Sequence, residues 1–160
     1  MTADNTPQKK VRKYIPNEIL LSQVAHYIRE GRSVTLTVRG NSMNPFLVSG
    51  RDQVILSPFT EEELQPGAVI LAREYEGRVL LHRIIHRQGE ILTMLGDSNI
   101  HHPEQTNISD VIGIVTKTIR KGKEYACHKQ TWQWYSLLWT KLHPIRKELL
   151  ILFHILHRYK

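Results

Sequence analysis

Cysteine is nearly absent from this sequence of 160 residues, in which Cys127 stands alone. A lone cysteine excludes an internal disulfide framework and any zinc cluster built on several thiolates. It also fits a reducing compartment. Because apolar residues make up 41% of the chain and are spread along it, we expect one buried core rather than several domains or wholesale disorder.

Long apolar runs are missing as well. No stretch of about 18 uncharged apolar residues occurs, so a membrane-spanning helix is not expected. The basic residues near the N-terminus are followed by no apolar run, so no signal peptide is expected either. These absences favour a cytoplasmic protein, with peripheral attachment at the inner membrane as the alternative.

The net charge of +7 is concentrated at the two ends of the chain. Residues 1–33 carry six Lys or Arg against three acids, and residues 117–160 carry ten against two. Residues 34–116 carry six against ten, so the central part is acidic. Basic flanks suit nucleic acid or an anionic membrane, or they only keep the protein in solution. Nucleic acid is not an expected partner, because the sequence offers no base-stacking platform or recognition helix.

Turn residues divide the chain into short elements. Residues 1–14 are predicted to form a flexible basic arm. Asn17 is a good N-cap for a helix with apolar residues at helical spacing, and Gly31 suits the end of that helix. Apolar or alternating runs bounded by Gly, Pro, Asn and Ser predict strands at 34–38, 53–56, 68–73, 79–86, 91–95 and 111–119.

This order of elements predicts a mainly β fold, with a compact antiparallel domain over residues 15–125 that includes the N-terminal helix. Residues 130–160 predict an amphipathic, basic helical tail that is kinked or divided at Pro144. Apolar residues share one face before the proline and another after it: Tyr135, Leu138, Trp139 and Leu142, then Ile145, Leu149, Leu152, Phe153 and Leu156. Aromatic anchors between cationic flanks are typical of helices on an anionic membrane surface, and docking on the β domain or on a partner is the alternative.

The segment after the first strand has the character of a nucleophile loop. A serine becomes a good nucleophile only beside a base, and its reaction needs donors for an oxyanion. Gly40 permits a tight turn and Pro45 stiffens its exit, so the turn can present Ser42 Oγ outward. We therefore expect Ser42 as the nucleophile, with Gly40, Asn41, Met43 and Pro45 forming the oxyanion and substrate-binding part.

His82 places a titratable ring inside an apolar run. Imidazole is the side chain best suited to accept a serine proton near neutral pH. If Gln88 and Gly89 form a two-residue hairpin loop, His82 lies opposite Leu95, and Asp97 lies on the diagonal from the imidazole. A carboxylate there would orient the ring, so Asp97 is predicted as the third catalytic residue. A different loop length would reverse this facing, and a role for Asp97 as a turn-former remains the alternative.

Six short motifs follow one another over residues 34–119. They are Gly-Asn-Ser-Met-Asn-Pro at 40–45, Gly-Arg-Asp-Gln-Val at 50–54, Gln-Pro-Gly-Ala-Val at 65–69, His-Arg-Ile at 82–84, Gly-Asp-Ser-Asn at 96–99 and Val-Ile-Gly-Ile-Val at 111–115. In order and spacing they resemble the superfamily that contains LexA-type self-cleaving repressors and type I signal peptidases. The basic tail is similar to that of an unanchored, bacterial branch of this superfamily.

The resemblance implies a coiled, antiparallel β fold and a serine endopeptidase. Ser42 matches the nucleophile, and His82 stands where repressors and most bacterial signal peptidases keep a lysine, as in the archaeal and endoplasmic-reticulum branch. Asp97 matches the Gly-Asp of the fifth motif, and Glu104 and Asp110 are weaker candidates for the acid. The residue two before the serine is a glycine, so the oxyanion hole would rest mainly on backbone N–H groups.

Three functions remain in competition. The first is an endopeptidase that cleaves a peptide or protein substrate by a Ser–His mechanism with acid support and without a cofactor. The second is a non-catalytic peptide-binding or regulatory module at a membrane surface. The third is self-cleavage, which ranks last because no linker separates two functional parts. No metal site is expected, because His82 and His86 alternate along a strand and match no zinc motif.

Overall fold

The computed structural model describes residues 17–99, 101–127, 134–135, 138–139, 142 and 146–158. The arm predicted at 1–14 lies outside these residues, as does part of the predicted tail. The helices and strands are α1 (Asn17–Arg29), β1 (Val34–Thr37), β2 (Asp52–Ser57), β3 (Val69–Arg73), β4 (Val79–Gln88), β5 (Ile91–Leu95), β6 (Glu104–Asn107), β7 (Val111–Arg120), β8 (Lys123–Ala126) and α3 (Arg146–Arg158). The predicted mainly β class is confirmed, together with a helix at each end.

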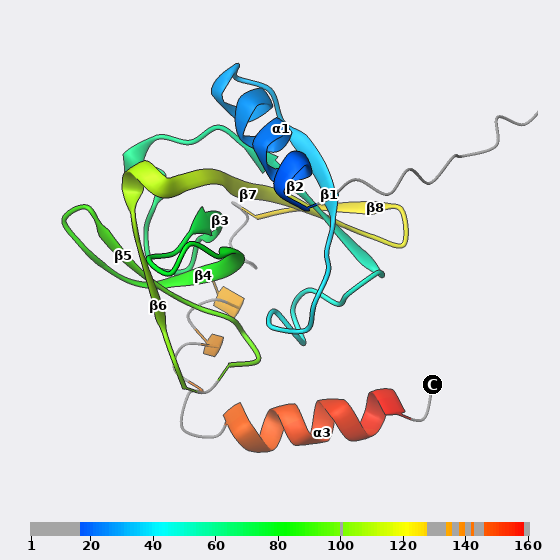
Figure 1. Ribbon diagram of the computed structural model, residues 1–160. Helices are drawn as coiled ribbons and strands as arrows, with labels where there is room; N and C mark the ends of the chain where they lie inside the picture. Colours follow the sequence, from blue (N-terminus) through cyan, green and yellow to red (C-terminus); the bar gives the residue numbers. More distant parts are fainter. Residues whose placement is uncertain are drawn as a thin grey trace, which may run out of the picture.

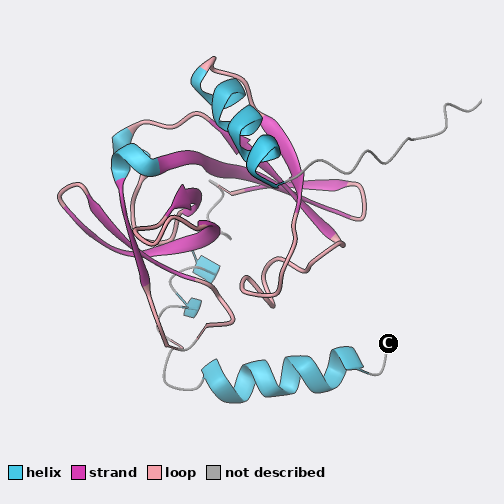
Figure 2. Cartoon of the chain, in the orientation of Figure 1, coloured by secondary structure: helices cyan, strands magenta, loops and turns pink. Residues whose placement is uncertain are grey.

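The strands form one antiparallel sheet in the order β1-β2-β7-β3-β4-β5-β6, with β8 paired to β7. The sheet curls into a half-barrel, with α1 lying against it at the top of Figure 1 and α3 below it. Figure 2 shows two loops on the side of the sheet nearer α3, one joining β1 to β2 and one joining β5 to β6. These two loops carry most of the residues that the sequence marks as functional.

The curl of the sheet buries both faces of its central strand. Val69 and Ile70 are neighbours in β3, yet they belong to different apolar clusters, because successive side chains of a strand point to opposite faces. The cluster of Val69 also contains Met43 and Leu47 from the β1–β2 loop. Side chains of this loop are therefore part of the core, and the core holds the loop in place.

Helix α1 packs on β7 close to Gly113. Val24 and Ile28, on the inner face of the helix, are buried. A Cβ atom at Gly113 would lie 3.6 Å from the Ile28 side chain and 3.2 Å from the backbone oxygen of Ser57. An alanine there would touch the helix at ordinary contact distance and would crowd only the Ser57 oxygen. The helix completes the core on the side of the sheet away from the β5–β6 loop.

The β4–β5 hairpin does not have the loop that the sequence predicts. Gln88 pairs with Ile91, so the two-residue loop is formed by Gly89 and Glu90 and not by Gln88 and Gly89. A β-bulge at Ile85 then shifts the register again within the same hairpin. Together the two effects leave the far end of the hairpin one residue away from the predicted register.

This shift decides which side chain faces the end of β5. Arg83, and not His82, lies opposite Leu95, so the predicted pairing of His82 with Leu95 is wrong. Because side chains alternate along a strand, an error of one residue exchanges the two faces of β4. The position opposite Leu95 that was predicted for His82 is therefore taken by Arg83.

The C-terminal segment follows the prediction in part. Residues 134–135 and 138–139 are helical, and α3 follows after Pro144, which itself lies outside the described residues. Trp139 is buried, but Leu138, predicted to share its face, is 58% exposed. Within the described part of the chain, no helix is both long and apolar enough to cross a membrane.

Candidate active site

The β1–β2 loop holds Ser42 at a partly exposed position. Gly40 has φ of +82°, a conformation that L side chains rarely adopt, and it begins the turn before the serine. Hydrogen bonds from the Asn44 N–H to the Asn41 carbonyl (3.1 Å) and from the Leu47 N–H to the Met43 carbonyl (2.8 Å) close the turns that follow. Ser42 therefore lies on a compact turn whose ends are fixed by the core.

Asp52 fixes the far end of the same loop. Its buried carboxylate accepts hydrogen bonds from the Val48 N–H (2.9 Å) and from the guanidinium groups of Arg51 and Arg120. Burial alone would raise the pKa of Asp52, but these hydrogen bonds outweigh it and lower the pKa to about 2. Arg120 also donates to the Phe46 carbonyl (2.7 Å), so the loop is joined directly to β7.

His82 lies in β4 with its ring almost completely buried. Its Nδ1 is 3.1 Å from Oε2 of Glu104, the first residue of β6. The Glu104 side chain is itself only 13% exposed. The direction of this hydrogen bond depends on the tautomer of the ring. With the proton on Nδ1, the Glu104 carboxylate accepts it and Nε2 keeps its lone pair.

Ser42 and His82 meet above Gly96, the residue that follows β5. Ser42 Cβ lies 3.1 Å, and His82 Nε2 3.0 Å, from the position that a Cβ on Gly96 would occupy. Ser42 Cβ and His82 Nε2 are therefore no farther apart than the sum of these two distances. Ser42 Oγ and His82 Nε2 are not joined by a hydrogen bond in the structure, and such contacts often tighten only when substrate binds. The missing side chain at Gly96 is what lets the hydroxyl and the imidazole approach.

The environment of His82 favours its neutral form. Burial lowers the pKa of His82 below its ordinary value of 6.5, because a charged imidazolium would lose its hydration. The carboxylate of Glu104 acts in the opposite direction, and Asp97 does so more weakly. A neutral imidazole held by Glu104 is the form that can accept a proton from Ser42.

Asp97 does not bond to His82, although the sequence predicts that it orients the ring. Its two carboxylate oxygens accept hydrogen bonds from Nε (2.8 Å) and one terminal nitrogen (2.7 Å) of Arg83. Both side chains are only 2% exposed. Arg83 also donates to the Gly67 carbonyl (2.9 Å). Arg83 was not predicted as a site residue, although its position next to His82 in an apolar strand was the available signal.

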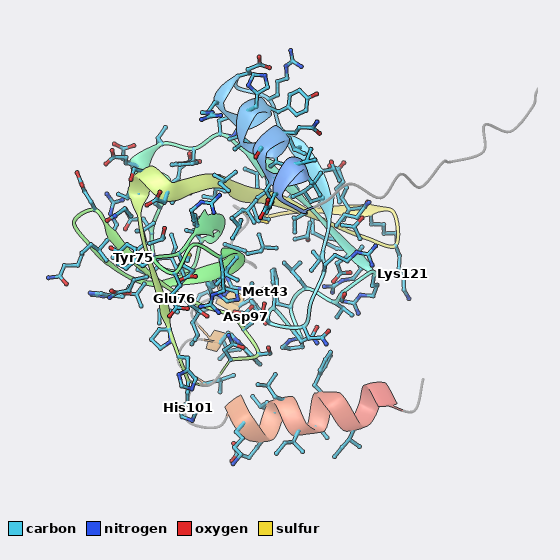
Figure 3. All side chains as sticks on the ribbon, viewed as in Figure 1. Met43, Tyr75, Glu76, Asp97, His101 and Lys121 are labelled. Carbon is cyan, nitrogen blue, oxygen red and sulfur yellow. The ribbon has the colours of Figure 1, made fainter. Side chains whose placement is uncertain are left out.

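The turn that contains Asp97 is attached to the nucleophile loop. The Ser98 N–H donates to the Ser42 carbonyl (2.8 Å), and Ser98 Oγ donates to the Asn41 carbonyl (2.9 Å). Figure 3 shows Met43 and Asp97 close together where this turn and the loop meet. The structure thus brings Ser42, His82 and the Asp97 turn into one site, with Glu104 rather than Asp97 on the imidazole.

The residues predicted to bind the oxyanion have different positions. Among the described residues, no acceptor takes the backbone N–H groups of Ser42 and Met43. The Asn41 carbonyl is occupied by Ser98 and Asn44, and the Met43 side chain is buried in the core. Pro45 follows Asn44 through a cis peptide bond.

A pocket opens beside Ser42, between the nucleophile loop and the start of β4. It is lined by Val38, Arg39, Gly40, Ser42, Met43, Val79, Leu80 and Leu81. β4 pairs with β3 from Val79 onward but with β5 only from Arg83 onward. The first residues of β4 therefore have one edge that no described strand pairs with, and this edge borders the pocket.

Other chemistry finds less support within the described residues. No group of three or more His, Cys, Asp or Glu side chains converges there on a position that could hold a metal ion. Cys127 is buried, and burial raises the pKa of its thiol to about 12, so it is a poor nucleophile. Ser42 with His82 is the pair whose geometry suits nucleophilic chemistry.

Comparisons of the chain with protein-family models, with curated proteins and with solved structures find no match.

Proposed function

We propose that this chain is a serine endopeptidase of the LexA and signal-peptidase kind. One observation carries the proposal: Ser42 Cβ and His82 Nε2 lie against the same face of Gly96, while His82 Nδ1 is bonded to Glu104. A hydroxyl, a neutral buried imidazole and an orienting carboxylate are the three groups of the Ser–His–acid mechanism. Glu104 takes the orienting role that was predicted for Asp97.

The reaction would proceed in two steps. His82 Nε2 takes the proton of Ser42 Oγ as the oxygen attacks the scissile carbonyl. The backbone N–H groups of Ser42 and Met43, which have no acceptor among the described residues, would receive the oxyanion. The imidazolium then gives its proton to the leaving amine. Water, deprotonated by His82, hydrolyses the acyl-enzyme and restores Ser42. Glu104 keeps the Nδ1 proton in place and stabilises the imidazolium while it exists.

An extended peptide is the substrate that fits the pocket. The open edge at the start of β4 offers backbone N–H and C=O groups to a strand laid along it. Val38, Val79 and Leu81 give the pocket an apolar lining beside the nucleophile. We therefore expect cleavage within an extended segment that places an apolar or small side chain next to the scissile bond.

Labelling and cleavage test the proposal together. The purified protein is treated with a serine-directed phosphonate and, separately, with a peptide library, and both reactions are read by mass spectrometry. We expect a single label on Ser42 and defined cleavage products, both lost in Ser42→Ala and in His82→Ala. Ser22→Ala is the matched control, because Ser22 Oγ bonds only within α1, to the Glu18 carbonyl. Cleavage by a purified Ser42→Ala protein would refute the assignment.

The alternative of a non-catalytic peptide-binding module predicts a different result. In that case the folded wild-type protein takes no label on Ser42, and peptides bind with equal affinity to the wild type and to Ser42→Ala. The open edge of β4 serves binding in either case. Labelling and binding measured on the same two proteins therefore distinguish the two functions.

We also propose that the C-terminal segment meets an anionic membrane surface. On α3, Ile151, Leu152 and Ile155 are each more than half exposed, whereas Leu150 on the opposite side is buried. Residues 117–160 carry ten Lys or Arg against two acids. Such a helix binds a bilayer through apolar burial and attraction to anionic lipid. Sedimentation with phosphatidylglycerol vesicles, but not with phosphatidylcholine vesicles, is expected, and Ile151→Ser should weaken it.

A further inference from the structure

Trp139 connects the C-terminal segment to the turn beneath the catalytic pair. Its indole Nε1 donates to the backbone carbonyl of Asp97 at 3.1 Å, and the side chain is only 7% exposed. A buried indole N–H usually has such a partner, so this hydrogen bond also fixes the orientation of the ring. The residues at the two ends of the bond are 42 positions apart in the chain.

Aromatic contacts extend this connection to the nucleophile loop. Tyr135 stacks on Trp139, with ring centroids 5.9 Å apart and planes 10° from parallel. The Tyr135 ring also contacts Phe46, at a centroid distance of 4.9 Å. The Arg83 guanidinium lies 5.0 Å from the centre of the Phe46 ring and 5.5 Å from that of Tyr135. The C-terminal segment thus contacts both the nucleophile loop and the buried Arg83–Asp97 pair.

Asp97 lies between the two residues that place Ser42. Gly96, on one side, supports the Ser42 and His82 side chains. Ser98, on the other side, donates to the carbonyls of Ser42 and Asn41. A displacement of the Asp97 carbonyl would therefore move both supports of the nucleophile together.

We propose that Trp139 is a positioning residue of the active site, and that the C-terminal segment is part of the catalytic unit. Trp139 holds the Asp97 carbonyl, and so holds the 96–99 turn against the Ser42 loop. Its catalytic consequence rests on the proposed peptidase function. Its structural consequence, the docking of the turn, can be measured whether or not the protein cleaves peptides.

Hydrogen exchange at the Ser98 amide reads the docking of the turn directly, because this N–H donates to the Ser42 carbonyl. Trp139→Phe keeps an aromatic ring but removes the indole donor, and we expect exchange at Ser98 to become about tenfold faster. The Gly50 amide, bonded to the Val38 carbonyl at the far end of the loop, should keep its wild-type rate. Unchanged exchange at Ser98 in a folded Trp139→Phe protein would overturn the proposal.

Trp134→Phe is the matched control, because Trp134 belongs to the same segment but is 67% exposed. It should leave the Ser98 exchange rate and the labelling of Ser42 at wild-type values. Trp139→Phe should lower kcat about tenfold and leave KM nearly unchanged, since the pocket itself is intact. A wild-type kcat together with faster Ser98 exchange would overturn the catalytic role of the contact.

Two other outcomes also test the role of Trp139. If Trp139→Phe does not fold, Tyr135→Leu removes the ring stacked on Trp139 and should accelerate exchange at Ser98 by a smaller factor, whereas no change there contradicts the proposal. If the wild type takes no label on Ser42, the peptidase proposal fails by itself, and the Ser98 exchange rates still decide whether Trp139 holds the turn.

Discussion

Two neighbouring residues of β4 each bind a carboxylate, yet the two pairs differ in kind. Arg83 and Asp97 form a two-point ion pair in which both side chains are 2% exposed. His82 and Glu104 share a single hydrogen bond, and Glu104 retains some contact with solvent. Since side chains alternate along a strand, these pairs lie on opposite faces of β4.

The difference lies in what each pair can do with a proton. The pKa of Arg83 is raised, because the Asp97 carboxylate outweighs the cost of burial, so the guanidinium stays charged and the pair is fixed. The pKa of His82 is lowered by burial, so its imidazole is neutral near pH 7 and is able to accept a proton. One pair therefore holds the site together, and the other is able to accept the proton that the proposed reaction moves.

Asp97→Asn should have the largest effect on stability. The substitution keeps the shape of the side chain but leaves the Arg83 charge buried without its partner. We expect a loss of about 3–5 kcal/mol in the free energy of unfolding, measured by urea denaturation. Lys117→Gln is the control, because the Lys117–Glu124 pair is about half exposed and should cost less than about 1 kcal/mol. Equal losses in the two variants would contradict the division between the pairs.

Glu104→Gln should have the opposite profile, with a large effect on rate and a smaller one on stability. Without the carboxylate the Nδ1 proton is no longer held, so we expect the rate of Ser42 acylation to fall about a hundredfold. Glu104 raises the pKa of His82, so its removal should move the midpoint of the pH–rate profile to lower pH. Wild-type acylation by Glu104→Gln would show that the imidazole does not depend on this carboxylate.

Gly96→Ala tests the point at which the catalytic pair meets the turn. The added methyl group would lie 2.5 Å from the Ser42 backbone oxygen and about 3 Å from the two catalytic side chains, so one of them must move. We expect a destabilisation of about 1–3 kcal/mol together with a loss of acylation. Gly89→Ala separates backbone strain from steric contact, since its Cβ would meet nothing within 4 Å but its φ of +59° disfavours an L side chain. Full activity in Gly96→Ala would contradict the close approach.

The pH dependence should be the smallest effect. Because the folded-state pKa of His82 is lowered, its contribution to stability is complete above pH 6.5 and is lost as pH falls from 6.5 toward the folded-state pKa. The stability due to Asp52 is lost separately, as pH falls from 3.8 to about 2. His82→Gln should remove the loss of stability that begins below pH 6.5 and leave the loss between pH 3.8 and about 2 unchanged, as measured by denaturation at several pH values. A loss of stability on raising pH through 6.5 would give the wrong sign.

Much of this fold could be predicted from the sequence. Turn residues and apolar runs predicted the helix at Asn17 and six of the strands, because local chemistry determines them. The strands β6 and β8 were missed, since Glu104–Asn107 and Lys123–Ala126 are short and polar. These two strands form because they pair with β5 and β7, and not because their own sequences favour a strand.

The acid of the site could not be assigned from the sequence for a similar reason. Which carboxylate meets His82 depends on the loop length and on the bulge at Ile85, and neither has a local signature. Because the β4–β5 register differs by one residue from the predicted one, Asp97 bonds to Arg83 and not to His82. Glu104 meets the imidazole because β6 adds to β5, a pairing that the sequence did not predict.

The state of the His82 ring tests the central claim most directly. Nitrogen NMR of the imidazole, assigned by comparison with His82→Gln, reports which nitrogen carries the proton and where the ring titrates. The account predicts a neutral ring at pH 7 with its proton on Nδ1, facing Glu104, and a pKa below 6.5. A proton on Nε2, or a ring still charged at pH 7, would leave Ser42 without a base and contradict the account.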